Sequence, residues 1–166
     1  FKGDGSDLFP GAGAGRMQKI TDWTHSSNVK ISFDITESLF SPWCAAVWGV
    51  PAVNNGKMYQ TLDLLPGLYL LKIDVGKVSS NNCAEMYGVV ATGTTLPDYN
   101  VVTTATETLG QDKLSDHLGV TRTIPFTVKT PSKVTIGTVF NLRNMYPVDG
   151  TPWTYMTIRG FTLSPQ

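Results

Sequence analysis

The stretch "GKMYQTLDLLPGLYLLKIDV", residues 56–75, carries the clearest secondary-structure signal in the chain. On both sides of Pro66-Gly67, apolar residues recur at every second position, as they do in a strand with one buried face. Pro66 presets φ for the second position of a turn, and Gly67 accepts the positive φ that a type II turn needs at its third position. The stretch therefore predicts a β-hairpin with its tip at Pro66-Gly67.

Gln60 is the polar exception on the buried face of this stretch, because it shares the parity of Met58 and Leu62. A buried amide needs hydrogen-bond partners. We interpret Gln60 as a side chain that ties the backbone of a neighbouring loop or strand. Contact with a ligand is the alternative.

The same period of two predicts further strands, and no segment shows a helical stripe longer than two turns. In "VKISFDIT", residues 29–36, the positions from Val29 to Ile35 alternate apolar and polar, so Asp34 is expected on the solvated face. In the last strand the apolar register changes at Gly160, where a β-bulge would return both halves to the core. Other strands are expected at residues 85–91, 100–104, 121–128, 134–142 and 153–163. Short strands with turns between them and no helices predict an all-β sandwich.

Length and charge narrow the classes of protein. At 166 residues the chain is expected to be one domain, with residues 1–17 as a lead-in or linker and residues 18–166 as a single β-sandwich. There are 13 basic and 13 acidic side chains and no basic stripe, which argues against nucleic acid as a partner. No apolar run reaches the 18 residues of a membrane-spanning helix. Because the chain begins at Phe1 without an initiating Met, we expect a trimmed fragment.

Catalytic and metal-binding motifs are missing from the sequence. The only two histidines, His25 and His117, lie far apart and without the spacing of metal ligands. The carboxylates in strands are interpreted as solvated, and nothing favours a catalytic pair among them. We therefore expect no enzyme and no cofactor. A structural calcium ion held by loop Asp and Asn oxygens remains an alternative.

Loop positions give a more specific prediction. In an antiparallel sandwich alternate loops emerge at the same end, so residues 37–57, 76–84, 105–120 and 143–152 are expected together, away from the Pro-Gly turn. Long loops on a rigid scaffold commonly carry binding sites. Trp48 is interpreted as core, Trp43 is left open between core and ligand contact, and Trp23 and Trp153 are interpreted as core or rim. The predicted ligand-binding residues are Trp43, Asn81, Asn82, His117, Arg143, Tyr146 and Asp149.

The two cysteines, Cys44 and Cys83, fall in neighbouring loops of this end. A disulfide is therefore geometrically conceivable, and its loop of about forty residues would contribute about 3–4 kcal/mol. Two buried thiols are the alternative.

Four segments together resemble a known domain class: "NGKMYQTLDLLPGLYLLKIDV", "YGVVATGTTLPDYN", "IPFTVKTPSKVTIGTVFNL" and "WTYMTIRGFTL". They are similar to the galactose-binding-like jelly-roll domains of secreted proteins and surface lipoproteins of gram-negative gut bacteria. Within that class, the resemblance is to a domain group of unknown function often found beside fibronectin-type or other carbohydrate-binding modules. It covers about residues 18–166 and carries no ligand residues over, because the matching positions are mostly packing and turn residues.

The resemblance implies a jelly-roll β-sandwich that binds carbohydrate without catalysis. It also implies a place outside the cytoplasm, at the outer-membrane surface or in the periplasm, in a lipoprotein-anchored parent protein with neighbouring domains. The alternative function is a structural or protein-interaction domain that anchors or spaces its neighbours and has no ligand of its own.

Overall fold

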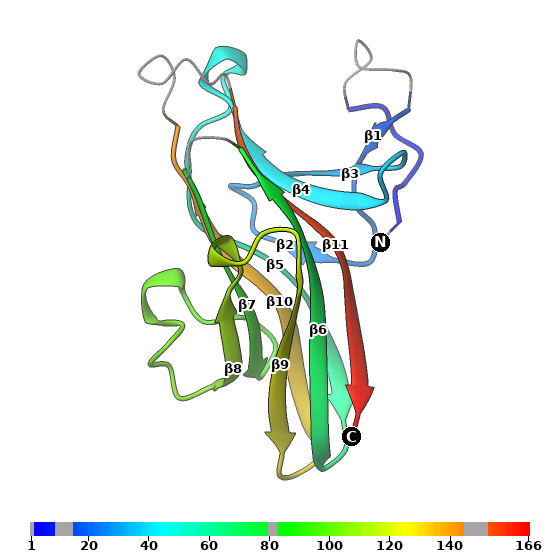
Figure 1. The fold of residues 1–166 in the computed structure, drawn as a ribbon, viewed down its shortest axis with the longest axis vertical. Coiled ribbons are helices and arrows are strands. Elements are labelled where there is room, and N and C mark those ends of the chain that lie inside the picture. The colour runs from blue at the N-terminus through cyan, green and yellow to red at the C-terminus, as the bar shows by residue number, and fades with distance from the viewer. Residues whose placement is uncertain (1, 9–14, 80–82, 145–152) are drawn as a thin grey trace.

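The computed structural model of the chain describes residues 2–8, 15–79, 83–144 and 153–166, whose strands form two antiparallel sheets (Figure 1). The first sheet has the order β1-β3-β4-β11-β6-β9 and the second has the order β2-β5-β10-β7-β8. The strands are β1 (Met17–Gln18), β2 (Thr24–His25), β3 (Lys30–Asp34), β4 (Leu39–Cys44), β5 (Val53–Leu64), β6 (Gly67–Val78), β7 (Ala84–Thr92), β8 (Thr108–Lys113), β9 (Thr121–Val128), β10 (Ser132–Leu142) and β11 (Thr154–Pro165). The described residues also contain the short 3-10 helices η2 (Ala46–Trp48), η3 (Tyr99–Val101) and η4 (Leu114–Asp116).

The order of the strands identifies the type of sandwich. From β4 onward, β4, β11, β6 and β9 are neighbours in one sheet, and β5, β10, β7 and β8 are neighbours in the other. This interleaving of early and late strands is the double-sheet jelly-roll arrangement. The predicted all-β, jelly-roll β-sandwich is therefore confirmed.

The main core lies between the sheets and is built from the inward positions of both. Its largest fully buried side chains include Phe40, Leu71, Phe140 and Ile158. The predicted bulge is confirmed, since Ile158 pairs with Val75 whereas Gly160 pairs with Asp74, which places an extra residue in β11. Ile35 departs from the predicted pattern, because it follows the end of β3 and is exposed.

Residues 56–75 contain two strands, but these do not form the predicted hairpin. β5 pairs with β2 and β10, whereas β6 pairs with β9 and β11, so the chain crosses from one sheet to the other at Leu65 and Pro66. Gly67 is the first residue of β6 and has no positive φ. The alternation was informative because both strands bury one face in the same core, but periodicity does not reveal the pairing partner. The interpretation of Gln60 is confirmed, because its Nε2 donates to the backbone carbonyl of Asp22 at 2.6 Å.

Three strand predictions need correction. Residues 39–44 and 108–113, expected in loops, form β4 and β8. Pro42 weakened the strand signal of β4. In the ladder between β4 and β11, Trp43 and Phe40 have partners, whereas Pro42 between them has none. Residues 100–104, expected as a strand, continue from η3 into turns.

The segment of residues 93–107 folds over the outer face of the second sheet. Below it lies a small second core, to which β7, β10 and the segment itself contribute: Val89, Ala91, Leu96, Val102 and Val139. Tyr99 packs edge-on against Tyr87 with 5.4 Å between ring centroids. Burial, together with the negative charge of Glu85, raises the pKa of Tyr99 to about 12. This face of the sandwich is thus covered by the protein's own chain.

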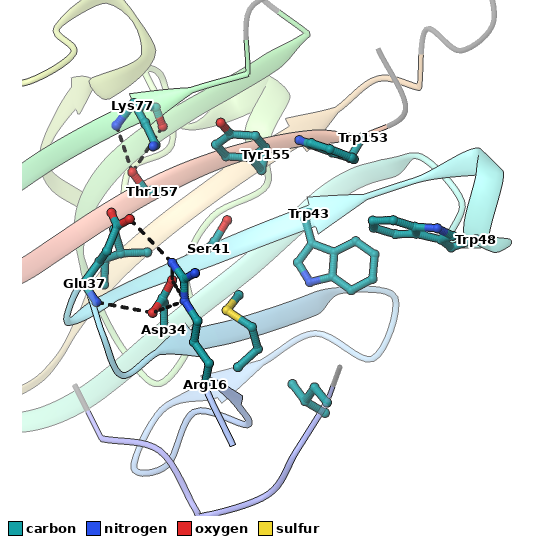
Figure 2. Close-up of a pocket in the computed structure, with 13 residues that line it drawn as sticks. Arg16, Asp34, Glu37, Ser41, Trp43, Trp48, Lys77, Trp153, Tyr155 and Thr157 are labelled. Carbon is teal, nitrogen blue, oxygen red and sulfur yellow. Dashed lines mark hydrogen bonds and ion pairs between the residues drawn. The ribbon is translucent and has the colours of Figure 1, made fainter. Parts of the chain in front are cut away.

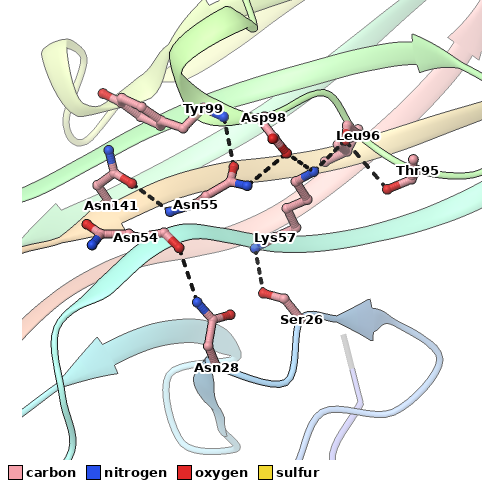
Figure 3. A network of polar contacts seen from close by, with 10 residues as sticks. All are labelled: Ser26, Asn28, Asn54, Asn55, Lys57, Thr95, Leu96, Asp98, Tyr99 and Asn141. Carbon is pink, nitrogen blue, oxygen red and sulfur yellow. Dashed lines mark hydrogen bonds and ion pairs between the residues drawn. The ribbon is translucent and has the colours of Figure 1, made fainter.

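A polar network holds this cover on β5 (Figure 3). Lys57 donates through Nζ to the Leu96 carbonyl at 2.8 Å and to the Asp98 carboxylate at 2.7 Å. Asn55 donates to the same carboxylate and accepts from the backbone N–H of Tyr99, both at 2.8 Å. Asn55 has a φ of 56°, a left-handed conformation that Asn tolerates better than most residues do. The network ties residues 96–99 to a single strand.

Candidate functional site

The outer face of the first sheet carries a hollow of about 710 Å³. Its floor is made by outward positions of β4 and β11, because alternate residues of a strand point away from the core. Ser41 and Thr157 are buried there although they face away from the core. The lining residues are Leu8, Arg16, Met17, Asp34, Glu37, Leu39, Ser41, Trp43, Trp48, Lys77, Trp153, Tyr155 and Thr157 (Figure 2).

Three indole rings form a continuous wall at one end of the hollow (Figure 2). Trp48 stacks on Trp153 with 5.7 Å between ring centroids and an interplanar angle of 17°. Trp43 meets Trp48 edge-on at 6.1 Å, and its indole nitrogen donates to the Ser32 hydroxyl at 2.9 Å. Trp48 is 58% exposed and Trp153 is 41% exposed. Large apolar rings held at the surface beside a hollow are available to a ligand.

Arg16, Asp34 and Glu37 form an ion-paired cluster at the other end of the hollow. Arg16 contacts both oxygens of Asp34, with Nη2 at 2.7 Å from Oδ2, and its Nη2 lies 3.6 Å from Glu37 Oε1. The backbone N–H groups of Thr36 and Glu37 also donate to Asp34. Burial by itself would raise the pKa of Asp34, but the hydrogen bonds from Arg16 and the two backbone groups outweigh burial and lower it. Asp34 is therefore a buried, ionised anchor for Arg16.

The N-terminal segment supplies one wall of this hollow. β1 pairs with β3, with Met17 opposite Asp34, and the N–H of Leu8 donates to the Met17 carbonyl at 2.9 Å. Leu8, Arg16 and Met17 all line the hollow. Residues expected only as a lead-in thus reach the candidate site, while the division of the chain at residues 17 and 18 stays a prediction.

Three of the predicted ligand residues, Trp43, His117 and Arg143, lie within the described residues. Trp43 lines the hollow, as one of its two interpretations required. His117 follows η4, with its imidazole Nε2 3.9 Å from Asp112 Oδ1, and Arg143 follows β10, where its backbone N–H donates to the Cys83 carbonyl at 2.8 Å. Neither lines the hollow, and a ligand role for them stays a prediction. The other four predicted residues, Asn81, Asn82, Tyr146 and Asp149, lie outside the described residues.

Two interpretations of hollow residues from the sequence were wrong. Trp48 is exposed instead of buried in the core, because η2 carries it past the end of β4. Asp34 is 5% exposed instead of solvated, because Arg16 and the turn after β3 enclose it.

Sequence reasoning also missed several lining residues. The signal for Tyr155 and Thr157 was present, since they alternate with the core residues Met156 and Ile158. Arg16 and Lys77 gave no such signal.

The cysteines are two buried thiols in the structure instead of a disulfide. The Cys44 thiol donates to the Leu142 carbonyl at 3.8 Å, and burial raises its pKa. Within the described ranges, no three His, Cys, Asp or Glu side chains are grouped so that they could hold a metal ion. Nor does the part of the chain that the structure describes contain a helix long and apolar enough to cross a membrane.

Comparison with known proteins gives one family and a set of solved structures. A family model described as a domain of unknown function (DUF5013) matches residues 14–137. TmCBM61, solved in complex with β-1,4-galactotriose, is 13% identical with a TM-score of 0.49, covering 89% of this chain and 91% of that one. One of the promiscuous carbohydrate-binding modules from the β-sandwich superfamily is 11% identical with a TM-score of 0.46, covering 98% of this chain and 62% of that one. A search of curated proteins finds no significant match.

Proposed function

Because the chain belongs to the family of domains of unknown function DUF5013, we propose a function for it from its hollow: it is a non-catalytic module that binds a carbohydrate. The observation that carries this proposal is the wall of three indole rings, two of them well exposed, beside side chains that can hydrogen-bond. Trp side chains are normally largely buried. Three of them together at an open surface therefore mark a place where a ligand or another molecule binds.

The chemistry of the hollow suits a sugar chain. A pyranose ring has an apolar C–H surface that can lie on an aromatic face, and hydroxyl groups at its edge that need donors and acceptors. Trp48 and Trp153 offer aromatic surface, while Tyr155 and Lys77 offer donors nearby. The volume of about 710 Å³ lies within the range of small-ligand sites and has room for more than one ring.

The two carboxylates of the hollow are poorly suited to glycoside hydrolysis. A glycosidase needs one carboxylic acid that donates a proton and a second carboxylate across the scissile bond. Asp34 and Glu37 instead contact the same guanidinium group, and the lowered pKa of Asp34 keeps it ionised. These contacts support a binding role without catalysis.

We also propose that the module belongs to a larger protein displayed outside the cytoplasm, at the outer-membrane surface or in the periplasm. The support is the sequence resemblance to domains of secreted proteins and surface lipoproteins. Protease treatment of intact cells that make the parent protein would test this placement. A parent protein that stays protected in intact and in osmotically shocked cells would contradict it.

The binding proposal is tested by titrating the chain with a glycan panel while following tryptophan fluorescence. Trp48→Ala is expected to weaken binding at least tenfold, because the indole at the centre of the aromatic wall is lost. Its stability should change little, since Trp48 is exposed. Leu68→Ala is the matched control, because Leu68 is as exposed but lies on β6 near the crossing between sheets. Failure of every glycan to bind, or normal binding by Trp48→Ala, would contradict the proposal and favour the structural alternative.

A further inference from the structure

The charges that line the hollow are unevenly paired. Arg16, Asp34 and Glu37 form one cluster in which each charge has an opposite charge within 4 Å. Lys77, the fourth charged lining residue, makes no ion pair within the described residues. Among the described residues, Lys77 is therefore the charged lining residue that has no ion pair.

A local irregularity of β6 directs Lys77 to this position. Val78 pairs with Met156 and Val75 pairs with Ile158, so two residues of β6 stand where β11 has one. Such bulges re-aim a side chain and are common beside functional sites.

Thr157 fixes the bulge. Its hydroxyl accepts from the Lys77 N–H at 2.8 Å and donates to the Lys77 carbonyl at 3.3 Å. Gly76 permits the close approach, because a Cβ there would lie 2.0 Å from the Thr157 hydroxyl oxygen. The backbone beneath Lys77 is thus held in place from the floor of the hollow (Figure 2).

From this arrangement, and resting on the proposed carbohydrate function, we infer that the glycan carries an anionic substituent, a carboxylate or a sulfate, which binds against Lys77. A charge-assisted hydrogen bond to an ammonium group is stronger than one between neutral partners. Glu37 is already paired with Arg16, whereas Lys77 makes no ion pair among the described residues, so the substituent is expected at Lys77. The sugar ring that bears it then lies toward Tyr155 and the indoles.

The test measures affinity by calorimetry for matched pairs of oligosaccharides. One pair is an oligouronate and the same chain after reduction of its carboxyl groups; the other is a sulfated oligosaccharide and its desulfated form. The wild-type chain is expected to bind an acidic member about three- to tenfold more tightly than its neutral partner, with the preference shrinking in high salt. Which pair shows the preference tells carboxylate from sulfate.

Two variants separate the role of Lys77 from general surface charge. Lys77→Met is expected to abolish the preference for the acidic member while binding of the neutral member persists. Lys72→Met removes the same charge from an exposed position of β6 that does not line the hollow, and should leave the preference intact. Unfolding curves of both variants check that the fold is preserved.

Each outcome bears on one of the two proposals. Equal or tighter binding of the neutral members, or a preference that survives Lys77→Met, would overturn the inference about Lys77 and leave carbohydrate binding standing. Failure of all four oligosaccharides while a neutral glycan of the panel binds would overturn the inference about Lys77 alone, and failure of every glycan tested would overturn both proposals.

Discussion

The two outer faces of the sandwich differ in what covers them. On the second sheet, residues 93–107 bury Val89, Val102 and their neighbours, and the tyrosines there pack against one another. On the first sheet, residues 2–8 and 15–17 reach one side only, and Trp48 and Trp153 remain exposed beside a hollow. Both faces have aromatic side chains on a rigid sheet. The comparison teaches that an aromatic cluster becomes a candidate site only where the chain leaves its face open.

The polar side chains of the two faces also differ in how many of their bonds are made within the protein. On the covered face, Asn55, Lys57 and Asp98 all bond within the protein. On the open face, Arg16 and Asp34 bond to each other, while Lys77 makes no ion pair within the described ranges. Polar side chains thus hold the cover in place on one face and line a cavity on the other.

Among the substitutions that test the difference between the two faces, Leu96→Ala is expected to change the free energy of unfolding most. Leu96 is 1% exposed in the small core under residues 93–107, so truncation should lower the free energy of unfolding by about 3 kcal/mol. Denaturant unfolding measures the loss. Ligand affinity should not change, because the hollow lies on the opposite face.

Val101→Ala is the control for Leu96→Ala. Val101 lies in the same segment, in η3, but is 41% exposed, so its truncation should cost less than 1 kcal/mol. Equal losses from the two variants would show that residues 93–107 do not bury a core.

A smaller effect, about 2 kcal/mol of unfolding free energy, is expected from Asn55→Ala. The change removes the side-chain bonds to Asp98 and to the Tyr99 N–H and places Ala at a left-handed φ. Asn55→Gly removes the same bonds but tolerates that φ, so it should cost about 1 kcal/mol less. If Gly were as destabilising as Ala in urea titrations, the backbone conformation at this residue would not be the one described.

The smallest effect is expected from Asp34→Asn on the open face, about 1–2 kcal/mol at pH 7, because Arg16 is partly exposed. The pKa of Asp34 in the folded chain lies below its unfolded value of about 3.9. Its stabilisation is therefore complete above that value and is lost as the pH falls through the folded pKa. Thermal unfolding at several pH values should show the variant and the wild type converging in acid.

Asp63→Asn serves as the control for Asp34→Asn. Asp63 pairs with Lys133 at 3.1 Å, but both side chains are largely exposed, so the change should stay within about 0.5 kcal/mol. A difference between Asp34→Asn and the wild type that persists unchanged at pH 2 would contradict the role given to the ionised carboxylate.

Local pattern in the sequence was sufficient for the fold class and for the bulge at Gly160, because alternation reports burial directly. It was insufficient for the pairing of β5 and β6, because two strands in different sheets bury alternate residues in the shared core just as two strands of one sheet do. Of the predicted ligand residues inside the described ranges, Trp43 lines the hollow and His117 does not. The prediction placed the site in loops, whereas the floor of the hollow consists of outward strand positions. Whether an outward side chain meets water or a cavity depends on segments far away in the sequence, such as residues 15–17.

The crossing at Leu65 and Pro66 has a consequence for the order of assembly. Consecutive strands such as β4 and β5, β5 and β6, or β10 and β11 enter opposite sheets, and most of their ladders join partners distant in the sequence. The second sheet does not need β11, but the first sheet stays in two parts, β1-β3-β4 and β6-β9, until β11 inserts between β4 and β6. Because non-local pairing is slow, we expect folding over milliseconds to seconds, in a step that requires the C-terminal strand.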